Sequence, residues 1–148
     1  MRKIPTAAIF LVAAALLVGG LLVLPFGNDT GSSVDTSAKI AQHPWLFAGV
    51  GLVVEVGEAL VWTVAFIESF AWALRAPWLG AIAGIAAYSV GFHWNRGLVG
   101  ILASGWIVLV LNVTYLILRE RSKKTAVLCT IGLKWCFLAY AAVDIARG

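Results

Sequence analysis

Charged residues are scarce in this chain of 148 residues. Only 12% of them are Asp, Glu, Lys or Arg and 61% are hydrophobic, whereas soluble domains carry about 25% charged residues. This balance excludes a water-soluble globule. The net charge of +4 at pH 7 does not point to nucleic acid, because the basic residues collect between apolar runs, as they do in the cytoplasmic loops of membrane proteins.

Cysteine and histidine are too few to build the common cofactor sites. Cys129 and Cys136 share one apolar run and would lie about 10 Å apart along a helix, which is too far for a disulfide. No CxxC spacing is present to bind zinc. His43 and His93 both fall at expected ends of membrane spans, so a haem held by two mid-membrane histidines is not expected. We predict no metal and no other cofactor.

Motifs of catalysis are also missing. The sequence has no GxSxG, HExxH or phosphate-binding loop, and no pairing of a nucleophile with a base is evident. We therefore assign no catalytic residues and do not expect an enzyme.

Long apolar runs dominate what is present. A helix of about 20 apolar residues crosses the roughly 30 Å hydrocarbon layer of a bilayer, and five runs of this kind predict an all-α, polytopic bundle in a single transmembrane domain, residues 1–148. The spans are expected at about 4–26, 45–67, 78–92, 97–118 and 126–146, with an outer polar loop over 28–43.

The first run could be an anchor or a signal sequence. Its unbroken apolar stretch, Thr6 to Leu24, is longer than the 7–15 residues typical of a signal peptide, which favours a retained signal-anchor. Cleavage after Ala38 stays the alternative and would leave four spans.

Basic residues predict the orientation. With the N-terminus inside, cytoplasmic segments hold seven Lys and Arg against three outside, which favours an N-in, C-out topology. We expect a multi-pass protein of the bacterial plasma (inner) membrane, with the lipid bilayer as one partner. The largest basic cluster is expected to contact anionic lipid and consists of Arg119, Arg121, Lys123 and Lys124.

Three charged residues fall near the middle of predicted spans, where a charge costs about 2.5–3.5 kcal/mol on insertion scales unless it is paired. Glu55 and Glu58 lie three apart on the second span, and Lys134 lies near the middle of the last. At about 1.5 Å per residue, Glu58 and Lys134 match in depth, so we expect them to pair. One lysine then faces two carboxylates, and we expect one carboxylate to hold a proton.

This cluster has two interpretations. In the first it locks the second span to the fifth, and Glu55 is a protonated hydrogen-bond donor. In the second, Glu55 and Glu58 form a proton or cation site gated by Lys134. Asn112 could contribute to either arrangement, although a single intramembrane asparagine is more often helix-packing glue.

The function that these features favour is a non-enzymatic accessory or assembly subunit of a larger membrane complex, with other membrane proteins or further copies of the chain as partners. Five short-looped helices leave little room for a closed catalytic cavity, and small-residue stripes on the second and third spans offer faces for helix docking. The alternative is a small oligomeric proton-coupled transporter or cation channel that uses Glu55, Glu58 and Lys134.

Overall fold

The computed structural model describes residues 4–23, 44–94 and 97–147, and every regular element in these ranges is a helix. This confirms the all-α class. The outer loop predicted over 28–43 lies outside the described residues. The elements, with η marking π-helical segments, are α1 Thr6–Val23, α3 Pro44–Glu58, η1 Ala59–Ala65, α4 Phe66–Leu74, α5 Pro77–Ala86, η2 Ala87–Phe92, α6 Gly97–Arg119 and α7 Lys123–Arg147.

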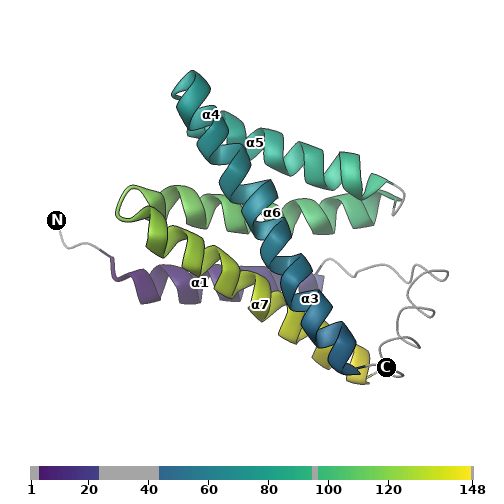
Figure 1. Ribbon diagram of the computed structural model, residues 1–148. Helices are drawn as coiled ribbons and strands as arrows, with labels where there is room; N and C mark the ends of the chain where they lie inside the picture. The colour runs from purple at the N-terminus through teal and green to yellow at the C-terminus, as the bar shows by residue number, and fades with distance from the viewer. Residues whose placement is uncertain (1–3, 24–43, 95–96, 148) are drawn as a thin grey trace.

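The second predicted span belongs to a longer helical rod. α3, η1 and α4 follow one another without a break from Pro44 to Leu74, and this rod crosses α7 and α6 in Figure 1. It continues beyond residue 67 because no glycine or proline interrupts 68–74. Arg75 ends it in the left-handed conformation, with φ 54°. Pro77 then opens α5 at its first turn, where its missing N–H costs nothing.

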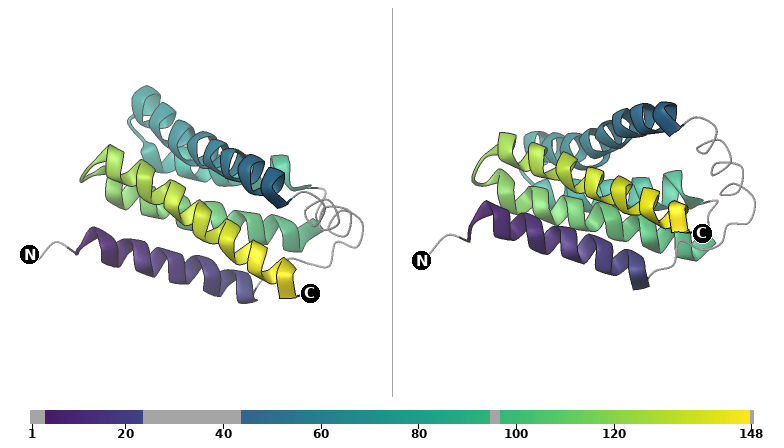
Figure 2. Two further views of the ribbon diagram at one scale, coloured as in Figure 1. Left: turned by 60° about the horizontal axis from the view of Figure 1, so that its bottom comes forward. Right: turned by 90° about the horizontal axis from the view of Figure 1, so that it is seen from below.

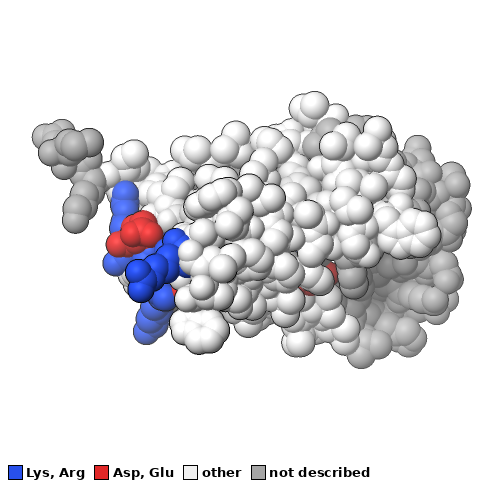
Figure 3. All heavy atoms as spheres, turned by 90° about the horizontal axis from the view of Figure 1, so that it is seen from above, with Lys and Arg blue, Asp and Glu red and all other residues white. Residues whose placement is uncertain are grey.

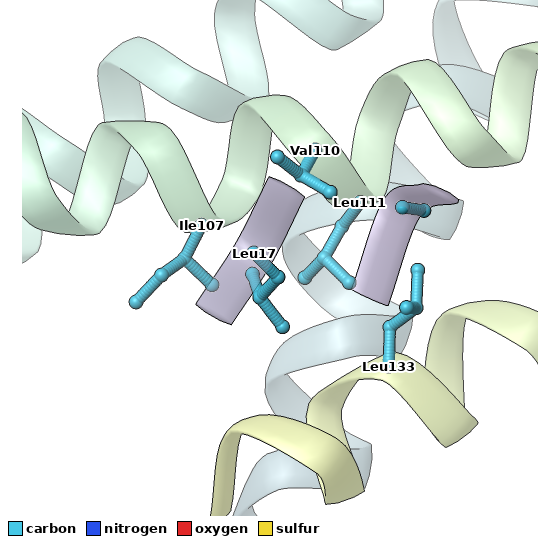
Figure 4. Close-up of a cluster of buried hydrophobic side chains, with 6 residues drawn as sticks. Leu17, Ile107, Val110, Leu111 and Leu133 are labelled. Atoms are coloured by element: carbon cyan, nitrogen blue, oxygen red, sulfur yellow. The ribbon is translucent and has the colours of Figure 1, made fainter. Parts of the chain in front are cut away.

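The main core lies where α1, α6 and α7 meet. Leu17 of α1, Leu111 of α6 and Leu133 of α7 are at most 1% exposed, and Figure 4 shows these side chains pointing toward one another from the three helices. Burying each such leucine contributes about 1.5–3 kcal/mol when the alternative is water. The three helices therefore form a common layer against which the rod and α5 pack.

Two glycines bring α5 against the rod. A Cβ placed on Gly80 would lie 2.5 Å from the carbonyl oxygen of Phe66, and one on Gly84 would lie 2.3 Å from that of Trp62. Any side chain larger than hydrogen would push the two backbones apart. The small-residue stripe predicted on the third span is therefore used, at these two glycines, for close helix packing within the chain.

The helices place their ends in two groups. Figure 2 shows the start of α1 and the turn between α6 and α7 at one end of the bundle, with the C-terminus at the other. The turn between α4 and α5 lies at the same end as the start of α1 (Figure 1).

Two helices are long and apolar enough to cross a membrane, namely Gly49–Leu74, with 26 residues, and Gly97–Arg119, with 23. This finding supports membrane association. It does not establish the five-span bundle, because the apolar helices Thr6–Gly20 and Pro77–Gly91 fall short of the roughly 20 residues that a crossing needs.

The outer surface is itself apolar. Leu11, Val53 and Leu98 are 66%, 72% and 71% exposed, and only 17% of the most apolar part of Gly49–Leu74 is buried inside the molecule. A helix in the core of a soluble protein would have the reverse pattern. Broad exposed apolar surface marks contact with lipid or with other proteins.

Candidate functional site

Lys134 lies at the centre of a buried charge cluster. Its side chain projects from α7 and the residue is only 1% exposed. The ammonium nitrogen Nζ lies 2.7 Å from Oε2 of Glu55 and 2.8 Å from Oε2 of Glu58. The two glutamate side chains are 14% and 19% exposed, so all three charged groups are largely withdrawn from the surface. The structure thus brings together the three charged residues that the sequence singled out within its predicted spans.

The packing of α3 on α7 explains how these residues meet. A Cβ built on Gly51 would make ordinary contact with Leu138, at 3.7 Å. Glu55 is four residues after Gly51, and Lys134 is four residues before Leu138. In two antiparallel helices, these equal steps lead from the Gly51–Leu138 approach to the Glu55–Lys134 ion pair. The antiparallel register therefore places Glu55 opposite Lys134. Matching by depth in the sequence put Glu58 there instead, and the long lysine side chain reaches both.

Aromatic side chains complete the site. The hydroxyl of Tyr88 donates a hydrogen bond of 2.8 Å to Oε2 of Glu58. The ammonium of Lys134 also lies 5.6 Å from the ring centroids of Tyr88 and Phe137, within the range of cation–π attraction. The ring of His93, which is 7% exposed, meets the Tyr88 ring edge-on at 4.7 Å. The lysine charge is therefore stabilised by carboxylates and by ring faces together.

Charge within the cluster does not balance. Two carboxylates share one ammonium, which leaves one negative charge if all three groups are ionised. No other Lys or Arg among the described side chains lies within 4 Å of either glutamate as an ion pair. Keeping a net charge in a low-dielectric interior is costly, so the site favours uptake of one more positive charge. The simplest such charge is a proton on one of the two carboxylates.

Both π-helical segments border the cluster. η1 begins directly after Glu58, and η2 contains Tyr88. π-helical turns are rare and occur often at functional sites, because the extra residue shifts the side chains that follow it around the helix. The sequence carried no signal for either segment.

Asn112 does not join the cluster. It is fully buried in α6, and its side-chain amide donates a hydrogen bond of 2.9 Å to the carbonyl oxygen of Ala81 in α5. This contact ties α6 to α5, which is the packing role considered for it in the sequence.

A second set of charges lies at the end of the bundle that holds the α6–α7 turn. Glu68 of α4 accepts a hydrogen bond of 3.0 Å from Arg119 and one of 3.1 Å from the hydroxyl of Tyr115, and it also pairs with Lys123. The guanidinium of Arg119 reaches Glu120 as well, at 3.2 Å. Two of the four cations predicted to contact lipid are therefore already paired with carboxylates.

The other two cations of that set keep their charge uncompensated among the described residues. Arg121 donates a hydrogen bond to the backbone carbonyl of Ile4, and Lys124 is exposed. Figure 3 shows Lys and Arg side chains gathered at this end, whereas most of the face in view carries neither sign of charge.

Sequence reasoning missed Tyr88 and Glu68 as site residues. Tyr88 offered a weak signal, since it is the one residue with a phenolic hydroxyl in the third run. Glu68 follows the predicted second span, in a stretch whose tryptophans and arginine are typical of a lipid headgroup boundary. His43 lies outside the described residues. Within the part of the chain whose side chains are described, no group of three or more His, Cys, Asp or Glu could hold a metal, and both cysteines are free.

Chemically, the cluster can hold and release a positive charge or fasten two helices together. It offers no nucleophile beside a base among its described residues. Comparison of the chain with protein-family models, curated proteins and solved structures found no match.

Proposed function

We propose that the chain is a multi-pass protein of the bacterial inner membrane with five spans, an inside N-terminus and an outside C-terminus. The exposed apolar surface and the two membrane-length helices support this proposal. The gathering of Arg119, Arg121, Lys123 and Lys124 at the end where α1 begins supports the orientation, because basic residues favour the cytoplasmic side.

Within that membrane, we propose a non-enzymatic role as an accessory or assembly subunit of a larger complex. One observation carries this proposal, namely the unfilled glycine face of α3. A Cβ on Gly49 or Gly57 would have no neighbour within 4 Å, and Val53 between them is 72% exposed. These residues are four apart and share one side of the helix.

Glycine faces of this kind let another helix approach closely in a membrane. The chain uses its other pair, Gly80 and Gly84, for contact between α5 and the rod. The α3 pair has the same chemistry and no partner within the described residues, so it suits a helix of another subunit.

The opposite side of α3 faces the bundle. Gly51 faces Leu138 of α7, and Glu55 and Glu58 are ion-paired with Lys134 of the same helix. We propose that this ion-paired contact fastens α3 in place, so that its outer glycine face is presented in a single orientation. The cluster is then a structural lock for an interaction surface.

Affinity purification in mild detergent with mass spectrometry of the intact complex tests this role. We expect other membrane subunits to co-purify in fixed stoichiometry, and we expect the double variant Gly49→Leu/Gly57→Leu to lose them. Gly19→Leu is the matched control, because Gly19 of α1 also has open space around a Cβ. Equal recovery of partners with all three proteins, or a chain that purifies without them, would refute the proposal.

The unbalanced charge of the cluster favours a second candidate, a small oligomeric proton-coupled transporter or cation channel. Glu55 and Glu58 share Lys134, and the excess carboxylate is suited to bind a proton or another cation.

Flux in liposomes separates the two functions. Transport requires that Glu55→Gln folds normally and abolishes pH-dependent flux, with Glu120→Gln, an exposed carboxylate at the basic end, as the control. A protein whose Glu55→Gln variant behaves as wild type in flux, or that carries no flux, supports the structural lock.

A further inference from the structure

An apolar groove runs along the outside of the bundle between α1 and α6. It encloses about 400 Å³. Val12 of α1 and Val113 of α6 are 60% and 46% exposed on its walls. The polar residue on the walls is Thr114, and its hydroxyl donates a 2.7 Å hydrogen bond to the carbonyl oxygen of Val110 in its own helix. The groove therefore suits a hydrocarbon chain and offers a polar ligand little to bind.

The groove has a definite length. It is lined from Ile4, just before α1, to Leu16 of α1 and from Ile117 to Trp106 of α6, and the stretch of α6 is about 16 Å long at about 1.5 Å per residue. At its inner end the indole of Trp106 donates a hydrogen bond of 3.1 Å to the carbonyl of Leu16 and bridges the two helices. One leaflet of a bilayer contributes about 15 Å of hydrocarbon. The groove is thus about as long as the hydrocarbon of a single leaflet, the length over which one acyl chain lies.

Positive charge lies at the end of the groove that holds Ile4. Arg121 donates to the carbonyl oxygen of Ile4, the residue that begins the groove. A guanidinium has five donors in all, so this contact leaves others for a phosphate. Lys124 lies three residues later, in the first turn of α7, and is exposed. Neither cation is paired with a carboxylate among the described residues, unlike Arg119 and Lys123.

We propose that the groove between α1 and α6 binds an anionic phospholipid, with one acyl chain along the groove and the headgroup phosphate on Arg121 and Lys124. Of the four cations that the sequence predicts to contact lipid, this site uses two. It also adds a binding groove for one acyl chain of the lipid. It rests on the proposed membrane orientation only for the leaflet, which is the cytoplasmic one, and it is independent of any partner subunit.

Native mass spectrometry of the purified chain in detergent tests the headgroup contact, with phosphatidylglycerol and phosphatidylcholine of identical acyl chains as probes. We expect preferential retention of phosphatidylglycerol. Arg121→Gln/Lys124→Gln should bind it about thirty-fold more weakly, which corresponds to about 2 kcal/mol for two cations at a charged lipid surface. Arg75→Gln removes one exposed charge at the same end, away from the groove, and should leave binding unchanged.

A second pair of variants tests whether the acyl chain binds in the groove. Val12→Trp fills the groove and should reduce binding of phosphatidylglycerol, whereas Leu128→Trp on α7, outside the groove and 59% exposed against 60% for Val12, should not. The single variant Lys124→Gln keeps the Arg121 contact with Ile4. Weaker lipid binding by this variant therefore reports the loss of a headgroup contact and not misfolding. Equal binding of both lipids, or full binding by Val12→Trp, would overturn the proposal whatever the co-purification of other subunits shows.

Discussion

Replacing Lys134 by methionine perturbs the charge cluster most directly. Methionine keeps the length of the side chain and removes the ammonium that lies 2.7 and 2.8 Å from two carboxylates. One of these already has reason to hold a proton in the wild type, so the variant has to protonate the other. At pH 7 this costs about 3.7 kcal/mol for a carboxyl with an ordinary pKa of about 4.3, at about 1.36 kcal/mol for each unit. The value agrees with about 3–5 kcal/mol for breaking a buried ion pair.

Reversible unfolding in mixed micelles of a mild detergent and dodecyl sulfate, followed by tryptophan fluorescence, measures this loss. We expect Lys134→Met to be about 3–4 kcal/mol less stable than wild type at pH 7. The deficit should shrink to about 1.6 kcal/mol at pH 5.5, because the unfolded carboxyl is then closer to its own titration and the proton costs less. Stability is thus lost as the pH rises.

Two further variants control the experiment. Lys124→Met removes an exposed lysine from the same helix and should change stability by no more than about 0.5 kcal/mol. Adding Glu55→Gln and Glu58→Gln to Lys134→Met should restore stability, because an uncharged cluster leaves no charge without a partner. Wild-type stability of Lys134→Met, or a deficit that is the same at both pH values, would refute the reasoning.

Three other predictions use the same unfolding assay. Gly84→Ala places a Cβ 2.3 Å from the carbonyl oxygen of Trp62 and should cost about 1–3 kcal/mol, whereas Gly19→Ala meets no neighbour and should be neutral or stabilising by up to about 1 kcal/mol. Tyr88→Phe removes a hydrogen bond of 2.8 Å to a carboxylate and should cost about 1.5–3 kcal/mol; no change would show that the bond is not made. Glu68→Gln breaks a partly exposed ion-pair set and should cost about 1 kcal/mol or less, with a smaller effect in 1 M salt.

Much of the helical framework could be predicted, because each apolar run is bounded by polar or helix-breaking residues. Pro77 marks the start of α5, and the polar sequence His93-Trp-Asn-Arg precedes α6. The extent of the rod was harder to foresee. The stretch after residue 67 reads as a headgroup boundary from its tryptophan and arginine, yet its backbone continues the helix to Leu74. How deep a residue lies in the bilayer and how far a helix extends are separate properties. Amino-acid composition indicates mainly the depth.

The candidate site was predictable in its charges and not in its surroundings. A lysine and two glutamates in otherwise apolar helices have to find each other, because the alternative is an unpaired charge in a low-dielectric interior. No comparable necessity points to Tyr88, whose hydroxyl could have been satisfied elsewhere. Asn112 illustrates the same limit, since an amide can bond to any nearby carbonyl, and here it bonds to that of Ala81.

Composition and the spacing of polar residues along each run are enough to predict the helical class, the apolar exterior and the identity of the charged groups that need partners. Which of these groups meet depends on how the helices pack. Leu138 lies where it would touch a Cβ on Gly51, which marks the register of α3 on α7, and that register places Glu55 opposite Lys134. It depends on how side chains of different helices interlock, which no single run contains.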